Sequence, residues 1–159
     1  MLHKCRPLLR RVDIQRIEAG VILLGVDYYS SPKVVLEARK STPLELGFGW
    51  MVDPARLASR GSFVGRDAIL AERQRGPAWH LVGLEVSWEA LEALYESFNL
   101  PPSLPATARR DGLPVFAEDG RQIGKATSHT WSPILKKYLV IASVHRGYEA
   151  KGTQLLLEH

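Results

Sequence analysis

The second half of the chain constrains the fold most, because turn residues divide it into short segments of strand character. Four such segments follow Pro101-Pro102: Leu113 to Glu118, Arg121 to Thr130, Tyr138 to Val144 and Gly152 to Glu158. The pair Asp119-Gly120 lies between the first two segments and is a typical two-residue signal for an antiparallel hairpin. The sequence therefore predicts a small antiparallel β-barrel here, with a sandwich as the alternative.

Two helices are predicted ahead of this region. Gly65 to Arg75 consists of good helix formers, ends in basic residues and stops at Gly76-Pro77. Trp88 to Phe98 follows Ser87, a favourable N-cap, and carries aromatic and leucine residues on one face that we interpret as core packing. Between the two helices, Trp79 to Val86 alternates in polarity and is predicted to be a short strand.

The first part of the chain has weaker signals. We expect a helix from Asp13, as its N-cap, to Ala19, ending at Gly20. Leu44 to Val52 alternates glycines with large residues and is predicted to be a strand that another group approaches closely. We place a domain boundary at Gly76-Pro77, which divides residues 1–76 from residues 77–159. The expected fold class is α+β.

Composition and charge exclude several classes of protein. The 159 residues carry 21 Lys and Arg against 17 Asp and Glu, a net charge of +4 at pH 7. The basic residues are scattered and form no nucleic-acid-binding motif, so nucleic-acid binding is only a third alternative. No apolar stretch approaches the roughly 20 residues of a membrane span, and no secretory signal is readable. Because Cys5 is also the only cysteine, we expect a cytoplasmic protein with no membrane partner.

Most motifs whose chemistry fixes their spacing are absent. The five histidines have no metal-ligand spacing, and Gly47-x-Gly49 lacks the third glycine of a dinucleotide-binding loop. Ser128 and His129 are not expected to share a proton, because adjacent residues of a strand point to opposite faces. We therefore assign no catalytic and no metal residue. Glu18, two residues before Gly20, is either a surface helix acid or an acceptor of paired hydrogen bonds from an N–H-rich heterocycle.

Five groups of residues resemble, in the same order, motifs of one family. They are Arg16 to Gly20 with Gly25-Val26-Asp27 (RLEAG and GVD), Pro43 to Trp50 (P-x-E-x-G-x-G-W), Phe63 to Leu70 (F-I-G-[KR]-x-A-L), Leu81 to Leu84 (LVGL), and Ile123 to Ser128 with Ser132-Pro133 and Ile141 to Val144 (I-G-x-x-T-S, S-P and I-A-x-V). The family is the aminomethyltransferases typified by the T-protein of the glycine cleavage system, together with folate-dependent demethylases. The chain resembles the C-terminal part of these proteins.

The resemblance implies a tetrahydrofolate-binding protein, whose full-length relatives pass a one-carbon or methyl unit from an amine or similar donor to the folate. It implies that Glu18 binds the N–H edge of the pterin ring. It also implies that Arg56, six residues after Trp50, faces the glutamate tail, with Arg60 as the alternative. Trp50 and Trp131 are expected to border the folate pocket or to pack in the core.

The chain departs from the family in two ways. The family's catalytic aspartate lies in a region that these residues lack, and the helix at 88–98 is an insertion that points to a divergent, demethylase-like branch. The resemblance implies a partial ferredoxin-like α/β segment over 1–76, followed over 77–159 by a small antiparallel β-barrel with an inserted helix. We expect the folate-binding C-terminal portion of a tetrahydrofolate-dependent aminomethyl- or methyltransferase, inactive alone and associated with itself or with an N-terminal partner chain. The alternative is a non-catalytic interaction or regulatory module that retains the fold.

Overall fold

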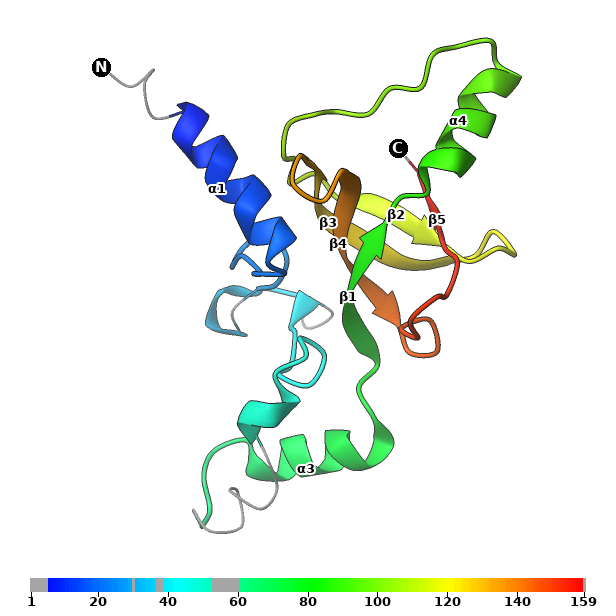
Figure 1. Ribbon diagram of the computed structural model, residues 1–159. Helices are drawn as coiled ribbons and strands as arrows, with labels where there is room; N and C mark the ends of the chain where they lie inside the picture. Colours follow the sequence, from blue (N-terminus) through cyan, green and yellow to red (C-terminus); the bar gives the residue numbers. More distant parts are fainter. Residues whose placement is uncertain (1–5, 30, 37–38, 53–60, 159) are drawn as a thin grey trace.

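The computed structural model describes residues 6–29, 31–36, 39–52 and 61–158 (Figure 1). In chain order the elements are α1 (Arg6–Glu18), the 3-10 helices η1 (Ser31–Lys33) and η3 (Gly49–Val52), α3 (Arg66–Arg75), β1 (Trp79–Glu85), α4 (Trp88–Ser97), β2 (Leu113–Phe116), β3 (Gln122–Ser132), β4 (Lys137–His145) and β5 (Leu156–Leu157). The α+β class is confirmed, and so is a helix inserted between two strands of the sheet. Residues 6–76, called the arm below, run down one side of the sheet in Figure 1.

The five strands form one antiparallel sheet in the order β1-β4-β3-β2-β5. Strands β1 and β5 are its two edges, so the sheet is open rather than a closed barrel. The predicted hairpin joins β2 to β3, with Gly120 at a φ of 80° directly after the turn. A Cβ atom at Gly124 of β3 would lie 2.5 Å from the carbonyl oxygen of Ser143, so the two central strands require glycine at this position.

The apolar core lies on one face of this sheet. Its buried members come from the turn-divided half of the chain and are Val115, Ala117, Ile123, Ala126, Tyr138, Val140, Ala142 and Val144. Residues Val82 and Leu84 of β1 and Leu157 of β5 pack against them. Because side chains alternate along a strand, the other face of β3 is left for the arm.

Helices α3 and α4 begin and end close to the predicted residues. Gly65 and Gly76 flank α3 with φ values of 89° and 79°, and the Ser87 hydroxyl accepts a hydrogen bond from the Ala90 N–H at the start of α4. The interpretation of the α4 stripe as core packing is wrong for Trp88, Leu94 and Phe98, which are exposed. Figure 1 shows α4 projecting beyond the end of the sheet, which agrees with the exposure of these three side chains.

Two expectations for the arm are corrected by the structure. Helix α1 begins at Arg6, so Asp13 lies inside the helix and is not its N-cap, although Gly20 ends the helix with a φ of 67°. The predicted strand at Leu44 to Val52 is a series of turns followed by η3. Gly47 has a φ of 78°, which is incompatible with an extended strand. The carbonyl oxygen of Glu45 accepts a 2.9 Å hydrogen bond from the N–H of Leu81 in β1, but the turn at Gly47 prevents the segment from continuing as an extended strand beside β1.

Within the described residues, no helix combines the length and apolar character that crossing a bilayer requires.

Candidate functional site

Glu18 lies at the last residue of α1, against the end of β3. The hydroxyl of Ser132 donates a hydrogen bond of 2.5 Å to Oε1 of Glu18. Ser132 is fully buried, whereas Glu18 is half-buried. The second carboxylate oxygen of Glu18 has no hydrogen-bond partner among the described residues. One oxygen is therefore fixed by the sheet, and the other stays available to a ligand.

The turn between β3 and β4 also fixes the orientation of the Ser132 hydroxyl. The N–H of Leu135 donates to the Ser132 Oγ over 2.9 Å, so the hydroxyl proton points toward Glu18. The hydrogen bond between Ser132 and Glu18 joins residues that are 114 positions apart in sequence. The hydrogen bond from Ser132 therefore anchors the Glu18 carboxylate, at the end of α1, to β3.

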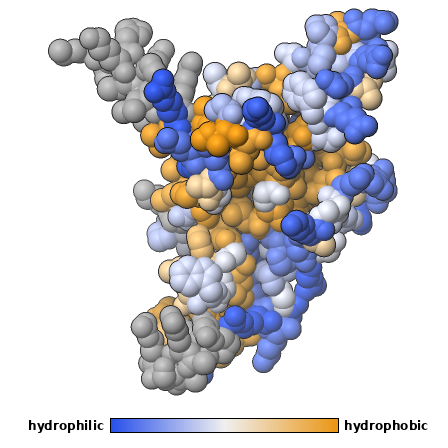
Figure 2. All heavy atoms as spheres, viewed as in Figure 1, coloured by the Kyte–Doolittle hydropathy of each residue, from blue (hydrophilic) through white to orange (hydrophobic). Residues whose placement is uncertain are grey.

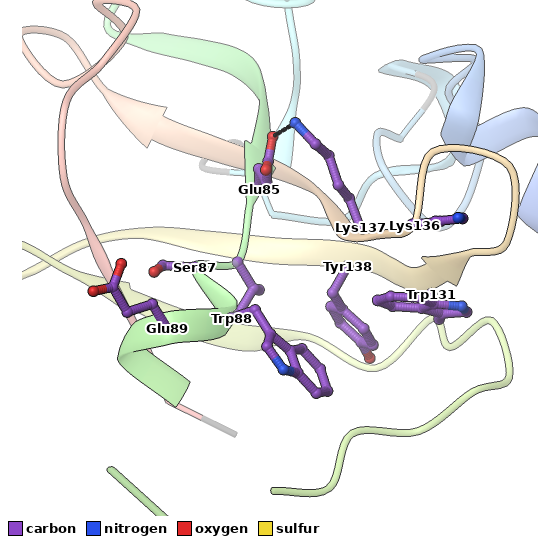
Figure 3. A pocket seen from close by; sticks show the side chains of 9 residues that line it. Glu85, Ser87, Trp88, Glu89, Trp131, Lys136, Lys137 and Tyr138 are labelled. Carbon is purple, nitrogen blue, oxygen red and sulfur yellow. Dashed lines mark hydrogen bonds and ion pairs between the residues drawn. The ribbon is translucent and has the colours of Figure 1, made fainter. Parts of the chain in front are cut away.

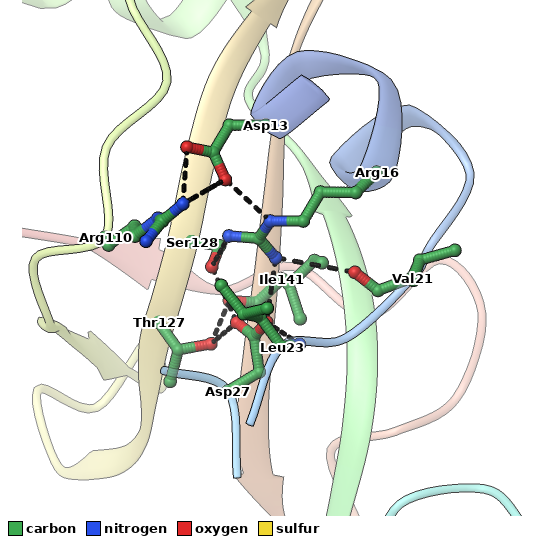
Figure 4. A network of polar contacts seen from close by, with 9 residues as sticks. All are labelled: Asp13, Arg16, Val21, Leu23, Asp27, Arg110, Thr127, Ser128 and Ile141. Carbon is green, nitrogen blue, oxygen red and sulfur yellow. Dashed lines mark hydrogen bonds and ion pairs between the residues drawn. The ribbon is translucent and has the colours of Figure 1, made fainter. Parts of the chain in front are cut away.

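A buried polar network holds the C-terminal end of α1 against the sheet (Figure 4). At its centre is Arg16, which is only 8% exposed. Its Nη1 donates to Oδ2 of Asp27 over 2.8 Å and its Nη2 donates to the Ser128 Oγ over 2.8 Å. The Nε atom bonds Oδ1 of Asp13 over 3.0 Å. Arg16 therefore ties together the helix, the following loop and β3, two residues before Glu18.

A β-bulge lets two adjacent hydroxyls reach the same carboxylate. The register between β3 and β4 shifts between Ala126 and Ser128. Such a bulge changes the usual alternation of side chains between the two faces. The hydroxyls of Thr127 and Ser128 each donate 2.6 Å hydrogen bonds to Oδ1 of Asp27, and the Leu23 N–H donates to its Oδ2. The buried Asp27 carboxylate is thus satisfied on both oxygens.

Asp13 extends the network toward solvent. It is bound on one side by Arg16 and on the other by Arg110, whose Nη2 lies 2.8 Å from Oδ2. Burial acts to raise the pKa of Asp13, but the hydrogen bonds from Arg16 and Arg110 outweigh it. The pKa of Asp13 is therefore held below its ordinary value of 3.8. The carboxylate stays ionised and keeps Arg16 oriented at neutral pH.

The structure does not bring the other predicted site residues to Glu18. Trp50 lies in η3 and is 69% exposed. Trp131 lies one residue before Ser132 on β3, so its side chain points to the opposite face, where its ring is 6.0 Å from that of Trp88. Arg56 and the alternative Arg60 lie outside the described residues.

Sequence reasoning missed the residues that position Glu18. The sequence marks Arg16 only as the first residue of a matched segment, and it predicts no role for the hydroxyls of Ser128 and Ser132. The available signal was the charge pair Arg16 and Asp27, each placed beside apolar residues within the matched segments. The prediction that Ser128 and His129 do not share a proton agrees with their contacts, because the His129 Nδ1 lies 2.7 Å from the Tyr138 hydroxyl instead.

Known proteins match both the sequence and the fold of this chain. Residues 98–159 match the model of the glycine cleavage T-protein C-terminal barrel domain. The aminomethyltransferase of Parasynechococcus marenigrum is 32% identical over 146 residues, which cover 92% of this chain and 32% of that protein. The mitochondrial aminomethyltransferase of Pisum sativum is 33% identical over 143 residues, covering 90% of this chain and 28% of that protein.

The chain resembles the C-terminal part of glycine cleavage T-proteins. The crystal structure of aminomethyltransferase T from Bartonella henselae matches with a TM-score of 0.67 and 23% identity, covering 92% of this chain and 33% of that one, which shows the shared fold. The resemblance stated from the motifs is confirmed. The chain spans about a third of the length of the relatives it matches.

Proposed function

We propose that the chain binds tetrahydrofolate as the C-terminal portion of a tetrahydrofolate-dependent aminomethyl- or methyltransferase. The observation that carries this proposal is the half-buried Glu18 carboxylate, which is held by Ser132 through one oxygen and has no partner among the described residues at the other. A carboxylate in this state fits the N–H-rich edge of a pterin, because it accepts a charge-assisted hydrogen bond without rearranging. The relatives named aminomethyltransferases support the same assignment.

The residues of this chain bind and orient rather than react. Glu18 accepts N–H groups of the ligand, Ser132 sets the direction of its carboxylate, and Arg16 anchors the helix end that carries it. Arg56 pairs with the anionic tail of the ligand in this proposal. Tetrahydrofolate, when bound, supplies the amine nitrogen that takes up the one-carbon unit. The donor of the one-carbon unit is an amine or a methylated compound.

These residues alone are proposed to bind the ligand without turnover, because positioning of the reacting groups supplies much of the rate in such transfers. The related aminomethyltransferases are about three times longer than this chain. Apolar side chains of the arm are also left uncovered, among them Val21, Val35, Trp50 and Val64. Figure 2 shows hydrophobic residues gathered over the middle of the face turned toward the viewer. We propose that self-association or an N-terminal partner chain covers this surface, and that the protein is cytoplasmic.

Calorimetric titration with tetrahydrofolate and 5-methyltetrahydrofolate tests the proposal. A hydrogen bond to a charged group contributes roughly 1.5–3 kcal/mol, so Glu18→Gln and Arg56→Ala are each expected to weaken binding by about one to two decades. Glu89→Gln is the matched control, because Glu89 is an exposed carboxylate on α4. Unchanged affinity in Glu18→Gln, with wild-type binding intact, contradicts the assigned role of Glu18.

A non-catalytic interaction module is the second candidate, and the uncovered apolar side chains of the arm favour it. In that case tetrahydrofolate does not bind, and substitutions at Glu18 and Arg56 leave association unchanged. Light scattering of the wild type and of Val64→Ser measures that association directly. Val64 is fully exposed, so the substitution reduces the apolar surface without changing the core.

A further inference from the structure

A cavity opens between α4 and the turn that joins β3 to β4 (Figure 3). Glu18 is not among the residues that line it. Its volume is about 480 Å³, within the range that small-molecule sites occupy. It lies at one end of the sheet, on the face that carries the apolar core. We call it the aromatic pocket, after Trp88, Trp131 and Tyr138, which line it.

The aromatic walls of the pocket are held by polar contacts at their edges. Trp88 donates its Nε1–H to Oε1 of Glu92 over 2.7 Å, yet the residue is 43% exposed. Its ring centroid lies 6.0 Å from that of Trp131, with the two planes inclined by 60°. Tyr138 is 1% exposed, and its hydroxyl lies 2.7 Å from the His129 Nδ1. The two partly open indoles offer an apolar surface against which a flat ligand can pack.

The charges around the pocket do not cancel at the side of Trp131. Lys137 donates to Glu85 over 2.8 Å, which leaves that pair neutral. The carboxylate of Glu89 points away from the two indoles in Figure 3. Lys136 lines the pocket beside Trp131, and its side-chain ammonium makes no hydrogen bond or ion pair to a described residue. The Lys136 ammonium therefore has no described partner on the Trp131 side of the cavity, whereas the carboxylate of Glu92 is bonded to the Trp88 indole.

The backbone at Lys136 adds an independent observation. Its φ is 54°, in the left-handed region that favours glycine. Its N–H closes the turn by donating to the carbonyl oxygen of Ser132 over 2.8 Å. A lysine at this position strains the turn, and nothing in the turn itself requires its side chain.

We propose that the aromatic pocket binds a planar aromatic carboxylate, with its ring against Trp88 and Trp131 and its anionic group paired with Lys136. The site goes beyond the proposed folate role and does not depend on it. Trp131 and Ser132 are neighbours on β3, and their side chains point to opposite faces of the sheet. A ligand in the aromatic pocket therefore does not contact Glu18.

The indole N–H signals in NMR spectra report on this site directly, because the chain has four tryptophans, at 50, 79, 88 and 131. On titration with 2-naphthoate, the signals of Trp88 and Trp131 are expected to shift to saturation, with a Kd of the order of 1 mM for a ligand of this size. The signals of Trp50 and Trp79 are expected to stay in place. No saturable shift at Trp88 or Trp131 would overturn the proposal.

Variants separate the ring contact from the charge. Trp88→Ala is expected to weaken naphthoate binding at least about 30-fold, as for a central aromatic anchor. Lys136→Gly removes the charge while relieving the left-handed backbone, so the fold is retained, and the expected loss is about 10-fold. Lys151→Gly, at another exposed turn, is the matched control and is expected to leave affinity unchanged.

Two further comparisons make the proposal refutable independently of folate. The cation 2-naphthylmethylammonium is expected to bind at least about 10-fold more weakly than 2-naphthoate. Equal binding of the two ions, or equal binding by Lys136→Gly, would contradict the assigned ligand class. Glu18→Gln is expected to bind naphthoate like the wild type, whereas loss of naphthoate binding in this variant would show that the two sites are one.

Discussion

The sheet and the arm are held in place by different interactions. Of the ten buried hydrophobic residues in the described part of the chain, only Ile17 precedes residue 77. By contrast, ten of the seventeen exposed large hydrophobic residues lie in the arm. The sheet thus has an apolar core of its own, whereas the arm is attached through Arg16, Asp27 and the hydroxyls of β3. The comparison teaches that the motifs shared with T-proteins include the residues of a polar joint.

A polar joint has consequences that an apolar one lacks. Its free energy is concentrated in a few buried groups, so removing one partner leaves another buried and unpaired. Its geometry is directional, and this suits a joint that places one carboxylate, Glu18, at a defined position on the end of β3. The apolar core of the sheet, in contrast, spreads its free energy over many contacts.

The largest expected effect comes from Arg16→Ala. This substitution leaves the buried carboxylate of Asp27 without its cation, which costs about 3–5 kcal/mol for a buried pair. Because the loss falls on the joint, thermolysin cleavage within residues 11–28 is expected to accelerate at least about 100-fold. Arg110→Ala is the control, since its exposed pair with Asp13 contributes less than about 1 kcal/mol. Equal acceleration in the two variants would break the comparison.

A smaller effect is expected in the core of the sheet. Val140 is 1% exposed at the centre of β4, and Val140→Ala is expected to lower the free energy of unfolding by about 2 kcal/mol. Val35, in the arm, is 95% exposed, and Val35→Ala is expected to change it by less than about 0.5 kcal/mol. Urea denaturation followed by circular dichroism measures both. Comparable losses would mean that the arm has an apolar core after all.

The smallest expected effect is the pH dependence of the joint. The pKa of Asp13 is depressed in the folded state, so its contribution is complete above the ordinary value of 3.8 and is lost as the pH falls through the folded pKa. Protection of α1 against hydrogen exchange is therefore expected to fall as the pH drops below 3.8 and through the lower folded pKa, by less than about 1 kcal/mol. The Asp13→Asn variant is expected to lack this increment. An identical pH dependence in both proteins would remove Asp13 from the joint.

The sequence allows much of the fold to be predicted, because the decisive signals are local. Gly65, Gly76 and Ser87 mark helix ends through their own backbone or side-chain chemistry, and the turn before Gly120 joins two alternating segments. The error at Leu44 to Val52 has a different cause. The segment has β1 beside it at Glu45, but Gly47 adopts a left-handed backbone that turns the chain, and local alternation does not predict that turn.

The candidate site is less predictable, because its parts are distant in sequence. Glu18 was identified from its segment, but its partner Ser132 lies 114 residues away. The bulge that turns Thr127 and Ser128 toward Asp27 breaks the alternation on which strand reasoning rests. The exposed stripe of α4 misled for a similar reason, since amphipathic spacing does not say which element faces the helix. The boundary between residues 1–76 and 77–159 stays a prediction.

Native-state hydrogen exchange on the wild type and on Arg16→Ala tests the central claim, that a buried polar joint holds the arm and its Glu18 against an independently stable sheet. Amides of β3 and β4 are expected to exchange only through global unfolding, and amides of α1 through a separate opening of lower free energy. Arg16→Ala is expected to lower the second value and to leave the first unchanged. A single value for α1, β3 and β4, lowered equally by the substitution, would contradict the account.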